Sequence, residues 1–428
     1  MICRSGRTGL NRPCSRGVPA VHSRSPFLLV LFFLAVLTAA GAWLLISRPL
    51  PVPVQPGEEP PPTLSLKPVA YADLPGWERD DQSAALEALL RSCAAMLRQS
   101  ADKPMDGDGF AGTVGDWQAD CRDAGGVRPG DPVAARRFFE DRFRPFSVRV
   151  GHSADGLFTG YYAPIVSGSR VRDETYNVPL YKAPPELVMV DLGAFRPSLK
   201  GERIAGKVEG NRLVPFASRG AIVGGALSGR GLEAMYLKDP VDAFFLQIQG
   251  SGLVRLPDGG MVRLGYAAQN GHPYTAIGKL LVQRGELTRE EASMQTIRAW
   301  VNTHGPEGAA LMDENASYVF FEEQQAEGAI GSQGVVLTGG RSLAVDRKHM
   351  PLGAPMWVDI ESEDGARKIR RLVIAQDTGG AIRGGVRGDF YWGEGDEAEA
   401  AAGAMKDPGR YYILLPLALA EKAARASQ

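Results

Sequence analysis

The segment from Leu372 to Gly393 constrains the fold more than any other part of the sequence. Its apolar run Leu372–Ala375 predicts a buried strand, and Asp377 follows with two glycines that allow a sharp turn and the close approach of a ligand. A second acid, Asp389, lies in the same segment beside an aromatic cluster, and Asp346 ends an earlier apolar run. Three aspartates at strand ends predict a carboxylate-lined groove for an uncharged polar ligand such as a sugar.

Length, charge and cysteine pattern exclude several classes of protein. At 428 residues the chain is too long for one ordinary domain and long enough for two domains with full cores. Its formal net charge of -1 gives no electrostatic reason to expect nucleic acid as a partner. Because the sequence has no CxxC and no HExxH motif and its histidines are scattered, we expect no metal site and no cofactor.

The N-terminal region predicts export and attachment to a membrane. Residues 1–25 contain arginines but no acid and predict a cytoplasmic basic tail, and the apolar segment at 26–46 is long enough to cross a bilayer as a helix. It exceeds the roughly 7–15 residues of a signal-peptide core, which favours an uncleaved anchor. The alternative is a signal peptide cleaved near Ala39–Ala42. In either case we expect the body of the protein in the periplasm of a bacterial cell envelope.

A proline-rich linker at 47–67 predicts an extended spacer between the membrane segment and the body. Apolar residues at helical spacing then predict a helix from Leu86 to Leu97 with Cys93 on its buried face. The pair Asp131–Pro132 is typical of the start of a second helix. Cys93 and Cys121 lie on the exported side, where two thiols more often pair than stay free, so we expect a disulfide, with two buried free thiols as the alternative.

From Phe146 onward the pattern changes to short β-like runs punctuated by Gly and Pro. These runs are Ser147–Val150, Leu157–Tyr162, Val178–Tyr181, Ala221–Val223 and Ala243–Gln249. A helical interlude is predicted at Ile277–Val282, and Thr288–Glu291 has the capping-box spacing of another helix start. After Tyr318–Phe321 a loop of low hydrophobicity is predicted at Glu322–Gln333, and it leads into the last β-rich section, which holds the three aspartates.

Several motifs, taken in their order along the chain, resemble the membrane-bound lytic murein transglycosylase A family. They are Thr159–Pro164 (TGYYAP), Gln249–Gly252 (QGSG), Asn270–Tyr274 (NGHPY), Ser317–Phe321 (SYVFF) and the three-aspartate section. The resemblance runs from about Gly156 to Leu415. Any one motif alone would be a weak signal, whereas the ordered set is specific.

The resemblance implies a mostly β protein with some helices. It implies a double-psi β-barrel domain built from residues 68–164 and 324–420, an inserted second β-barrel-like domain at 165–323, and a glycan groove between them. The implied activity is cleavage of the β-1,4 bond between N-acetylmuramic acid and N-acetylglucosamine in peptidoglycan, which leaves 1,6-anhydro-muramic acid ends. The implied partner is therefore the peptidoglycan glycan strand. Family members are often lipid-anchored through a cysteine, whereas this chain has none directly after its apolar segment.

By position, the resemblance assigns the catalytic role to Asp389 and supporting roles to Asp377 and Asp346. Ordinary glycosidases need two carboxylates. In a lytic transglycosylase the C6 hydroxyl of the sugar attacks C1, so one acid/base can suffice. Such an acid must start protonated, and we therefore expect burial or the neighbouring Asp377 to raise the pKa of Asp389.

The side chains expected to bind the sugar have hydroxyl, amide or flat aromatic groups, and we expect them at Gly-flanked, exposed positions. They are Thr159, Tyr161, Tyr162, Gln247, Gln249 and Trp392. On a strand, Tyr161 and Tyr162 would point to opposite faces, so only one of them should face the sugar. His272, in a Gly-Pro loop, is interpreted as structural.

Other interpretations of the same residues remain open. Each aspartate can cap a turn through its own backbone, and the acidic group from Glu394 onward is typical of a solvated helix start. The triplet Asp377-Thr378-Gly379 matches the aspartic protease signature, but a single-chain protease of that type needs a second copy, which this sequence lacks. A non-enzymatic peptidoglycan-binding module is the main alternative, and release of anhydro-ended muropeptides from purified wall distinguishes the two.

Overall fold

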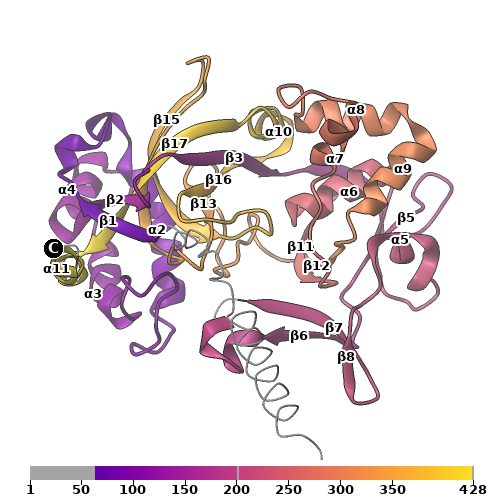
Figure 1. The fold of residues 1–428 in the computed structure, drawn as a ribbon, viewed down its shortest axis with the longest axis horizontal. Coiled ribbons are helices and arrows are strands. Elements are labelled where there is room, and N and C mark those ends of the chain that lie inside the picture. The colour runs from indigo at the N-terminus through magenta and orange to yellow at the C-terminus, as the bar shows by residue number, and fades with distance from the viewer. Residues whose placement is uncertain (1–62, 200–201, 427–428) are drawn as a thin grey trace, which may run out of the picture. The chain divides into compact units, whose positions relative to one another are not determined.

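The structure is a computed structural model that describes residues 63–199 and 202–426 (Figure 1). The expected basic tail, the apolar segment at 26–46 and the linker up to residue 62 lie outside these residues. Within the two described ranges, no helix combines the length and the apolar character that a membrane span requires.

A closed β-barrel carries the three aspartates of the C-terminal section. Its strands, in the order in which they hydrogen-bond, are β17 (Lys406–Pro416), β14 (Pro355–Glu361), β15 (Lys368–Asp377), β13 (Ser342–Val345), β16 (Arg387–Glu394) and β3 (Gly156–Ala163). β3 then pairs with β17, for example at Thr159 and Lys406, which closes the ring and removes a free sheet edge. β2 (Phe143–Val150) and β1 (Leu64–Pro68) extend the sheet from β17.

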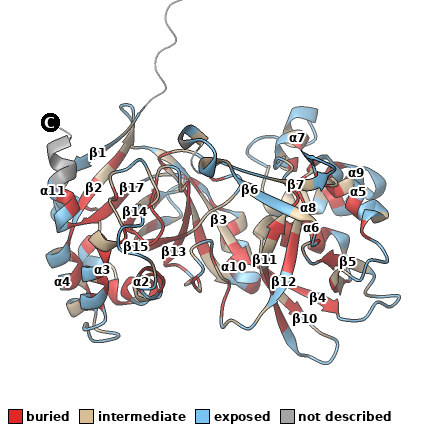
Figure 2. Cartoon of the chain, turned by 90° about the horizontal axis from the view of Figure 1, so that it is seen from below, coloured by how far each residue is buried: buried red, intermediate tan, exposed pale blue. Residues whose placement is uncertain are grey.

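The hydrophobic core of the barrel contains the buried strand that the sequence predicts. Leu372, Val373, Ile374 and Ala375 of β15 are each 0 % exposed, which confirms that prediction. Figure 2 shows buried residues along the barrel strands β13 and β15. Removing such a side chain from water contributes about 1.5–3 kcal/mol for each large aliphatic residue, so this strand is a rigid base for the acid at its end.

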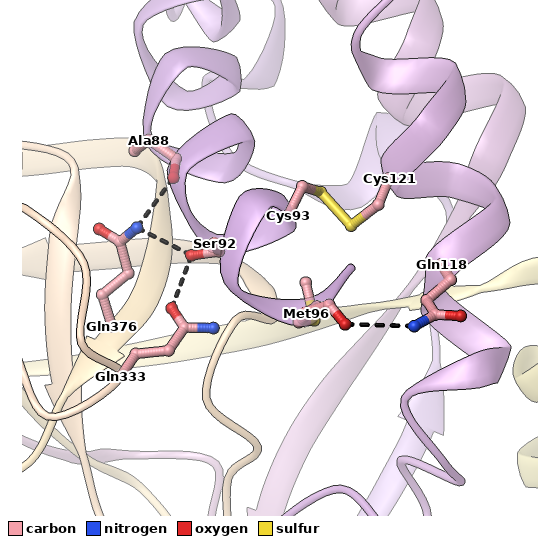
Figure 3. Close-up of a disulfide and its surroundings, with 8 residues drawn as sticks. All are labelled: Ala88, Ser92, Cys93, Met96, Gln118, Cys121, Gln333 and Gln376. Atoms are coloured by element: carbon pink, nitrogen blue, oxygen red, sulfur yellow. Dashed lines mark hydrogen bonds between the residues drawn. A yellow bond between two sulfur atoms is a disulfide. The ribbon is translucent and has the colours of Figure 1, made fainter. Parts of the chain in front are cut away.

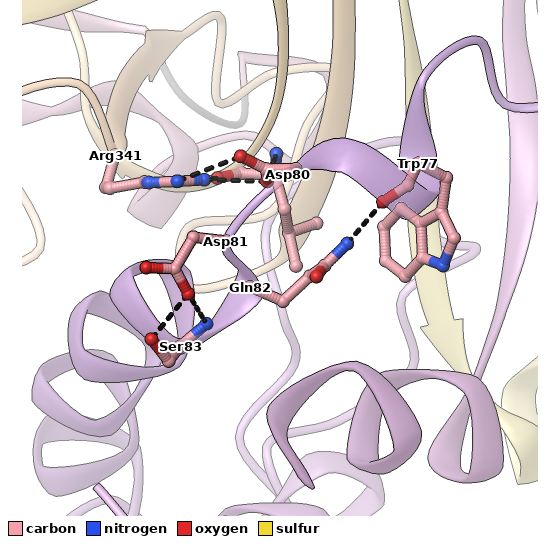
Figure 4. A network of polar contacts seen from close by, with 7 residues as sticks. Trp77, Asp80, Asp81, Gln82, Ser83 and Arg341 are labelled. Atoms are coloured by element: carbon pink, nitrogen blue, oxygen red, sulfur yellow. Dashed lines mark hydrogen bonds and ion pairs between the residues drawn. The ribbon is translucent and has the colours of Figure 1, made fainter. Parts of the chain in front are cut away.

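From residue 63 onward, three α-helices precede β2: α2 (Gln82–Met96), α3 (Gly115–Ala124) and α4 (Pro132–Arg142). Both predicted helices of this region are confirmed, as α2 and α4. The carboxylate of Asp81 caps α2 by accepting a hydrogen bond from the Ser83 amide at 3.0 Å (Figure 4). Asp131 caps α4 in the same way and is followed by Pro132 at the start of the helix.

A disulfide joins two of these helices. Cys93 of α2 and Cys121 of α3 are bonded, and their Cα atoms lie 5.1 Å apart (Figure 3). Cys93 is buried, as its helical spacing predicts. Gln118 of α3 also donates to the carbonyl oxygen of Met96 at 3.2 Å, so a covalent and a polar link fix α3 against α2.

A buried ion pair attaches the start of α2 to the barrel (Figure 4). Arg341, which precedes β13, donates to both carboxylate oxygens of Asp80 at 2.8 and 2.9 Å. Asp80 also accepts from the Leu372 amide of β15 at 2.9 Å. A bidentate pair of this kind has a defined geometry, and it therefore sets the position of α2 on the barrel.

Between β3 and β13 the chain forms a second β-rich region, here called the insert. Its larger sheet has the order β12 (Val319–Gln324), β11 (Met261–Gln269), β10 (Gly252–Arg255), β4 (Ile165–Ser169), β9 (Glu233–Leu237) and β5 (Val178–Tyr181). The edge strands β12 and β5 contact each other, which gives this sheet a barrel-like closure. A smaller sheet consists of β6 (Leu187–Asp191), β7 (Arg203–Glu209) and β8 (Arg212–Val214).

The helices of the insert are α5 (Arg219–Ala221), α6 (Pro240–Gln249), α7 (Ile277–Arg284), α8 (Met294–Thr303) and α9 (Gly305–Glu314). Helix α10 (Gly395–Gly403) follows β16, and α11 (Leu417–Ala426) follows β17. The predicted helix at Ile277 is confirmed as α7, and the acidic run after Glu394 opens α10, as expected.

Two predicted strands are wrong because a cap residue precedes each apolar run. Ala243–Gln249 lies in α6, where Asp239 accepts from the Val241 amide at 2.8 Å and Pro240 takes the first helical position. Ala221–Val223 is helical and has Ser218 as its N-cap. The other three predicted strands are confirmed in β2, β3 and β5.

Two predicted boundaries are also wrong. Thr288 and Glu291 bond each other within a turn, and α8 begins only after Ser293, whose hydroxyl accepts from the Thr296 amide at 3.2 Å. The linker was expected to extend to residue 67, but Leu64–Pro68 form β1, which pairs with β2 and buries Leu66. Pairing with a partner strand therefore overrides the proline-rich composition there.

Candidate functional site

Two of the three aspartates lie in one row across the barrel sheet. β13 has β15 on one side and β16 on the other, and Ala344 of β13 pairs with Asp377 across the first and with Asp389 across the second. Neighbouring strands lie about 4.8 Å apart, so the Cα atoms of the two acids are separated by roughly 10 Å. Thr159 of β3 lies opposite Asp389 and continues the row.

The carboxyl group of Asp389 has the properties of a general acid. Thr159 Oγ1 donates to Oδ1 at 2.6 Å, and no side chain or amide of the described residues donates to Oδ2. Burial raises the pKa of Asp389 to about 6; the Thr159 hydrogen bond and the charge of Arg387 oppose this shift, and the charge of Asp377 adds to it. Asp389 is therefore protonated at mildly acidic pH and has one oxygen available to a ligand.

Arg387 and Thr159 form a short hydrogen-bonded chain to this acid. Arg387 Nη2 donates to Thr159 Oγ1 at 2.8 Å, and Thr159 in turn donates to Asp389. Arg387 also donates to the carbonyl oxygens of Leu157 and Gly388. Because its donors are used in this way, Arg387 orients Thr159 and lowers the pKa of Asp389 through its charge, without direct contact between arginine and carboxylate.

The carboxylate of Asp377 is more fully occupied. Its Oδ1 accepts from the amide and the hydroxyl of Ser332 and from the Thr378 amide, each at 2.8 Å. Its Oδ2 accepts from Tyr161 Oη at 3.0 Å. Burial raises the pKa of Asp377, and these hydrogen bonds oppose the shift. With both oxygens engaged, Asp377 is better placed to act on Asp389 through its charge than to attack a sugar.

Asp346 is not part of the row that contains the other two acids. Its oxygens accept from the Lys348 amide at 3.1 Å and from the Gly384 amide at 2.8 Å, and the side chain is only 5 % exposed. The carboxylate therefore joins the turn after β13 to the loop before β16. This is the turn-orienting role that the sequence left open for it.

The two adjacent tyrosines of β3 point to opposite faces, as expected for a strand. Tyr161 lies on the face of the acids, where it contacts Asp377 and packs on Tyr391 with ring centroids 5.1 Å apart. Tyr162 is 1 % exposed and packs against Ala398 and Ala402 of α10. Only Tyr161 can contribute to a site around Asp389.

Three other expected binding residues do not lie open beside the acids. Gln247, in α6, is 5 % exposed, so the expectation of an exposed position is wrong; its side chain lies within a helix that faces a hydrophobic core. Gln249 Oε1 accepts from the Tyr162 amide at 3.2 Å and so ties α6 to β3. Trp392 packs edge-on against Phe390 at 5.1 Å, on the face of β16 opposite to Asp389.

Residues of the insert reach the barrel at two places. Arg263 of β11 is 8 % exposed and forms an ion pair with Glu394 at 2.5 Å, at the end of β16. Tyr274 keeps 37 % of its surface exposed. Partial burial raises the pKa of Tyr274, the charge of Arg219 opposes this shift, and the charge of Asp389 adds to it. This tyrosine of the NGHPY motif is therefore within electrostatic reach of Asp389. His272 Nε2 donates to the Phe216 carbonyl oxygen, 2.7 Å away, in the structural role expected for it.

Sequence patterns missed three residues of the site: Ser332 and Thr378, which bond Asp377, and Arg387, which acts on Asp389 through Thr159 and through its charge. Arg387 precedes Asp389 by one strand period, so the alternation of a β-strand would have placed it on the same face. Thr378 is adjacent to Asp377. Ser332 lies in a loop far away in the sequence, and no local signal links it to Asp377.

The fold and the site together define a β-barrel protein with an inserted β domain and a pair of electrostatically coupled carboxylates, of which one has a pKa raised to about 6. Perturbed acids of this type are typical of enzyme active sites. Comparisons with known proteins specify the family.

Two family profiles match the chain: the MltA specific insert domain over residues 157–322 and the 3D domain over residues 341–415. A crystal structure of the membrane-bound lytic murein transglycosylase from Agrobacterium tumefaciens is similar, with 35% sequence identity, a TM-score of 0.76 and coverage of 84% of this chain and 99% of that chain. The chain belongs to the membrane-bound lytic murein transglycosylase A family. This confirms the expected fold class of a double-psi barrel with an inserted barrel-like domain.

Two further relatives come from Escherichia coli. The membrane-bound lytic murein transglycosylase A of strain K12 is 34% identical over 264 residues, which are 60% of this chain and 65% of the relative's length. The crystal structure of E. coli MltA with bound chitohexaose has 26% identity and a TM-score of 0.57, and covers 84% of this chain and 95% of that chain.

Proposed function

We propose that this protein is a peptidoglycan lytic transglycosylase of the bacterial cell envelope, with Asp389 as its acid/base. The observation that carries the proposal is the carboxyl group of Asp389, which combines a pKa of about 6 with an oxygen that no described protein group occupies. Family membership supports the substrate class, and the relative with bound chitohexaose supports binding of a β-1,4-linked amino sugar chain in this fold.

The proposed reaction uses one carboxyl group twice. Protonated Asp389 donates its proton to the glycosidic oxygen as the bond from C1 of N-acetylmuramic acid to that oxygen breaks. The C6 hydroxyl oxygen of the same sugar then bonds to C1, and its proton passes to the Asp389 carboxylate. The product is a 1,6-anhydro ring, and no water is consumed.

Neighbouring residues support these two protonation states of Asp389. Asp377 helps to keep Asp389 protonated, since its charge raises the pKa, while Thr159 steadies the carboxylate after the proton has left. Tyr161, which contacts Asp377, and Tyr274, which faces from the insert, are the proposed contacts to the glycan. We place the glycan strand between barrel and insert.

Digestion of purified sacculi in ¹⁸O-labelled water tests the reaction type. We expect muropeptides with 1,6-anhydro-muramic acid ends and no ¹⁸O at the new ends. Labelled reducing ends would identify the protein as a hydrolase, and the absence of any released product would favour a binding module.

Substitution of the acid tests its assignment. Asp389→Asn keeps the shape of the side chain but has no proton to donate, so turnover should fall by at least roughly 10²–10⁴-fold. Asp359→Asn is a matched control, because Asp359 lies on barrel strand β14 and pairs with Arg370 at 2.8 Å, away from the acid row. Near-normal turnover by folded Asp389→Asn protein would remove this residue from the proposed role.

A further inference from the structure

A buried polar cluster lies where helix α2 meets the end of strand β15 (Figure 3). Its members are Ser92 of α2, Gln376 of β15 and Gln333 from the loop before β13. Ser92 and Gln376 are each 0 % exposed. Polar side chains at this depth are costly unless each of their groups is bonded, so their contacts are informative.

The contacts form one connected network. Gln376 Nε2 donates to the Ala88 carbonyl oxygen and to Ser92 Oγ, both at 2.8 Å. Gln376 Oε1 accepts from Ser342 Oγ at 2.6 Å. Ser92 Oγ then donates to Gln333 Oε1 at 2.7 Å. Both ends of the Gln376 amide are therefore held, one by α2 and the other by β13.

This network adjoins Asp377 in the chain. Gln376 directly precedes Asp377, at the point where the pairing of β15 with β13 shifts register, and its bonds to Ala88, Ser92 and Ser342 fix the end of the strand. The backbone amide of Gln333 also donates to the backbone carbonyl oxygen of Gln376 at 3.1 Å. Its neighbour Ser332 supplies two of the hydrogen bonds that Asp377 accepts. Strand end and loop thus fix Asp377 together.

Helix α2 is a suitable support for such a network because it is itself fixed at two points. Cys93, adjacent to Ser92, is disulfide-bonded to α3, and Asp80 joins the start of the helix to Arg341. Neither α2 nor the 331–333 loop lies within the segments that match the two family profiles, at 157–322 and 341–415.

We propose that Ser92 is a positioning residue for the reaction: through Gln376 and Gln333 it holds Asp377 and its loop in the arrangement that Asp389 requires. The proposal rests on the proposed function. Ser92 does not contact the substrate, so its effect should be on turnover and not on glycan binding.

The test compares two serines of the same helix in the full-length protein. Ser92→Ala removes the hydroxyl that joins Gln376 to Gln333. Ser83→Ala is the matched control, since Ser83 is also buried and bonds Asp81 within the helix start, but it makes no contact with the cluster (Figure 4). We expect Ser92→Ala to lower kcat by about tenfold, within the roughly 10²-fold that a displacement of about 1 Å can cause. KM for a soluble glycan oligomer should be unchanged, and Ser83→Ala should retain full kcat and KM.

A double-mutant cycle tests whether Ser92 acts through Asp377. Asp377→Asn gives the loss of kcat when the Asp377 carboxylate is absent. Adding Ser92→Ala to that variant should lower kcat no further, because Ser92 acts on the reaction by holding Asp377. Gln333→Ala removes the hydrogen bond between Ser92 and Gln333 from the other side. Because Gln333 is a half-buried loop residue, this variant should fold even if Ser92→Ala does not. It should give the same fall in kcat at constant KM.

The outcomes separate this inference from the proposed function. Wild-type protein that yields no anhydro-ended products would overturn the proposed function. If the wild type is active but Ser92→Ala and Gln333→Ala turn over like Ser83→Ala, the positioning role is wrong. A rise in KM without loss of kcat, or full additivity with Asp377→Asn, would overturn it as well.

Discussion

At the level of single residues, the hydrogen bond from Thr159 holds the pKa of Asp389 below the value that burial alone would give. Arg387, which donates to Thr159, keeps that hydroxyl directed toward the carboxyl group. Two neighbours of different charge therefore tune one acid in opposite directions, because Asp377 raises the same pKa. The balance determines the pH at which the acid loses its proton.

Thr159→Val should shift the pH dependence of activity. Valine has nearly the same shape but cannot donate to Asp389, so the pKa of Asp389 should rise above about 6, and the alkaline limb of the kcat/KM profile should move to higher pH. The profile is measured on a soluble glycan oligomer. Thr303→Val, at an exposed position of helix α8, is the control and should leave the limb in place. A shift to lower pH would contradict the assignment of this hydrogen bond.

Asp389 should also lower the stability of the protein at neutral pH. Its pKa is about 6 in the folded state against 3.8 for the ordinary side chain, so the folded state binds more protons in this window and loses stability as pH rises through it. Asp389→Asn does not titrate, and its thermal unfolding midpoint should exceed that of the wild type at neutral pH. The difference should disappear below about pH 3.8, where both states of the wild type are protonated. Equal midpoints across the whole range would mean that burial of this acid has no energetic cost.

At the level of elements, α2 precedes the barrel strands in the chain but is bonded directly to one of them, β15. It contacts β15 through Gln376 and is held by α3 through the Cys93–Cys121 disulfide. The disulfide closes a loop with a sequence separation of 28 residues, which restricts the unfolded chain.

Replacing Cys93 and Cys121 together by alanine should lower the free energy of unfolding by roughly 3–4 kcal/mol, the range expected for a loop of this length. Denaturant titration of the protein under non-reducing conditions measures the change. Wild-type protein with a reducing agent should show a similar loss. If the double variant and the wild type unfold at the same denaturant concentration, the disulfide makes no contribution to stability.

At the level of the whole molecule, we expect the position of the protein in the cell to depend on the N-terminal region. The apolar segment at 26–46 and the proline-rich stretch after it should hold the catalytic body at the membrane with reach toward the wall. Cell fractionation should recover the protein in the inner-membrane fraction, with its N-terminus intact by mass spectrometry. Mature protein in the soluble periplasm that begins near Ala39–Ala42 would instead show a cleaved signal peptide.

Local patterns in the sequence predicted much of the secondary structure around the site. The apolar run before Asp377 became β15, Asp131–Pro132 opened α4, and the helical spacing placed Cys93 on a buried face. These features depend on periodicity and capping, which involve residues a few positions apart. The run Ala243–Gln249 shows the limit of such patterns, because a short apolar run fits a strand or a buried helix equally well and only the preceding Asp239–Pro240 cap separates them.

The sequence by itself determined which residues can do chemistry, and the ordered motifs indicated the family to which the chain belongs. Only the tertiary structure decided which of these residues meet. Asp377 and Asp389 share a row because both pair with Ala344, while Asp346 is turned into a loop contact, and Ser332 contacts Asp377 from a distant segment. The physical reason is that strand register and barrel closure are set by hydrogen bonds between residues far apart in the chain, for which a single sequence contains no local signal.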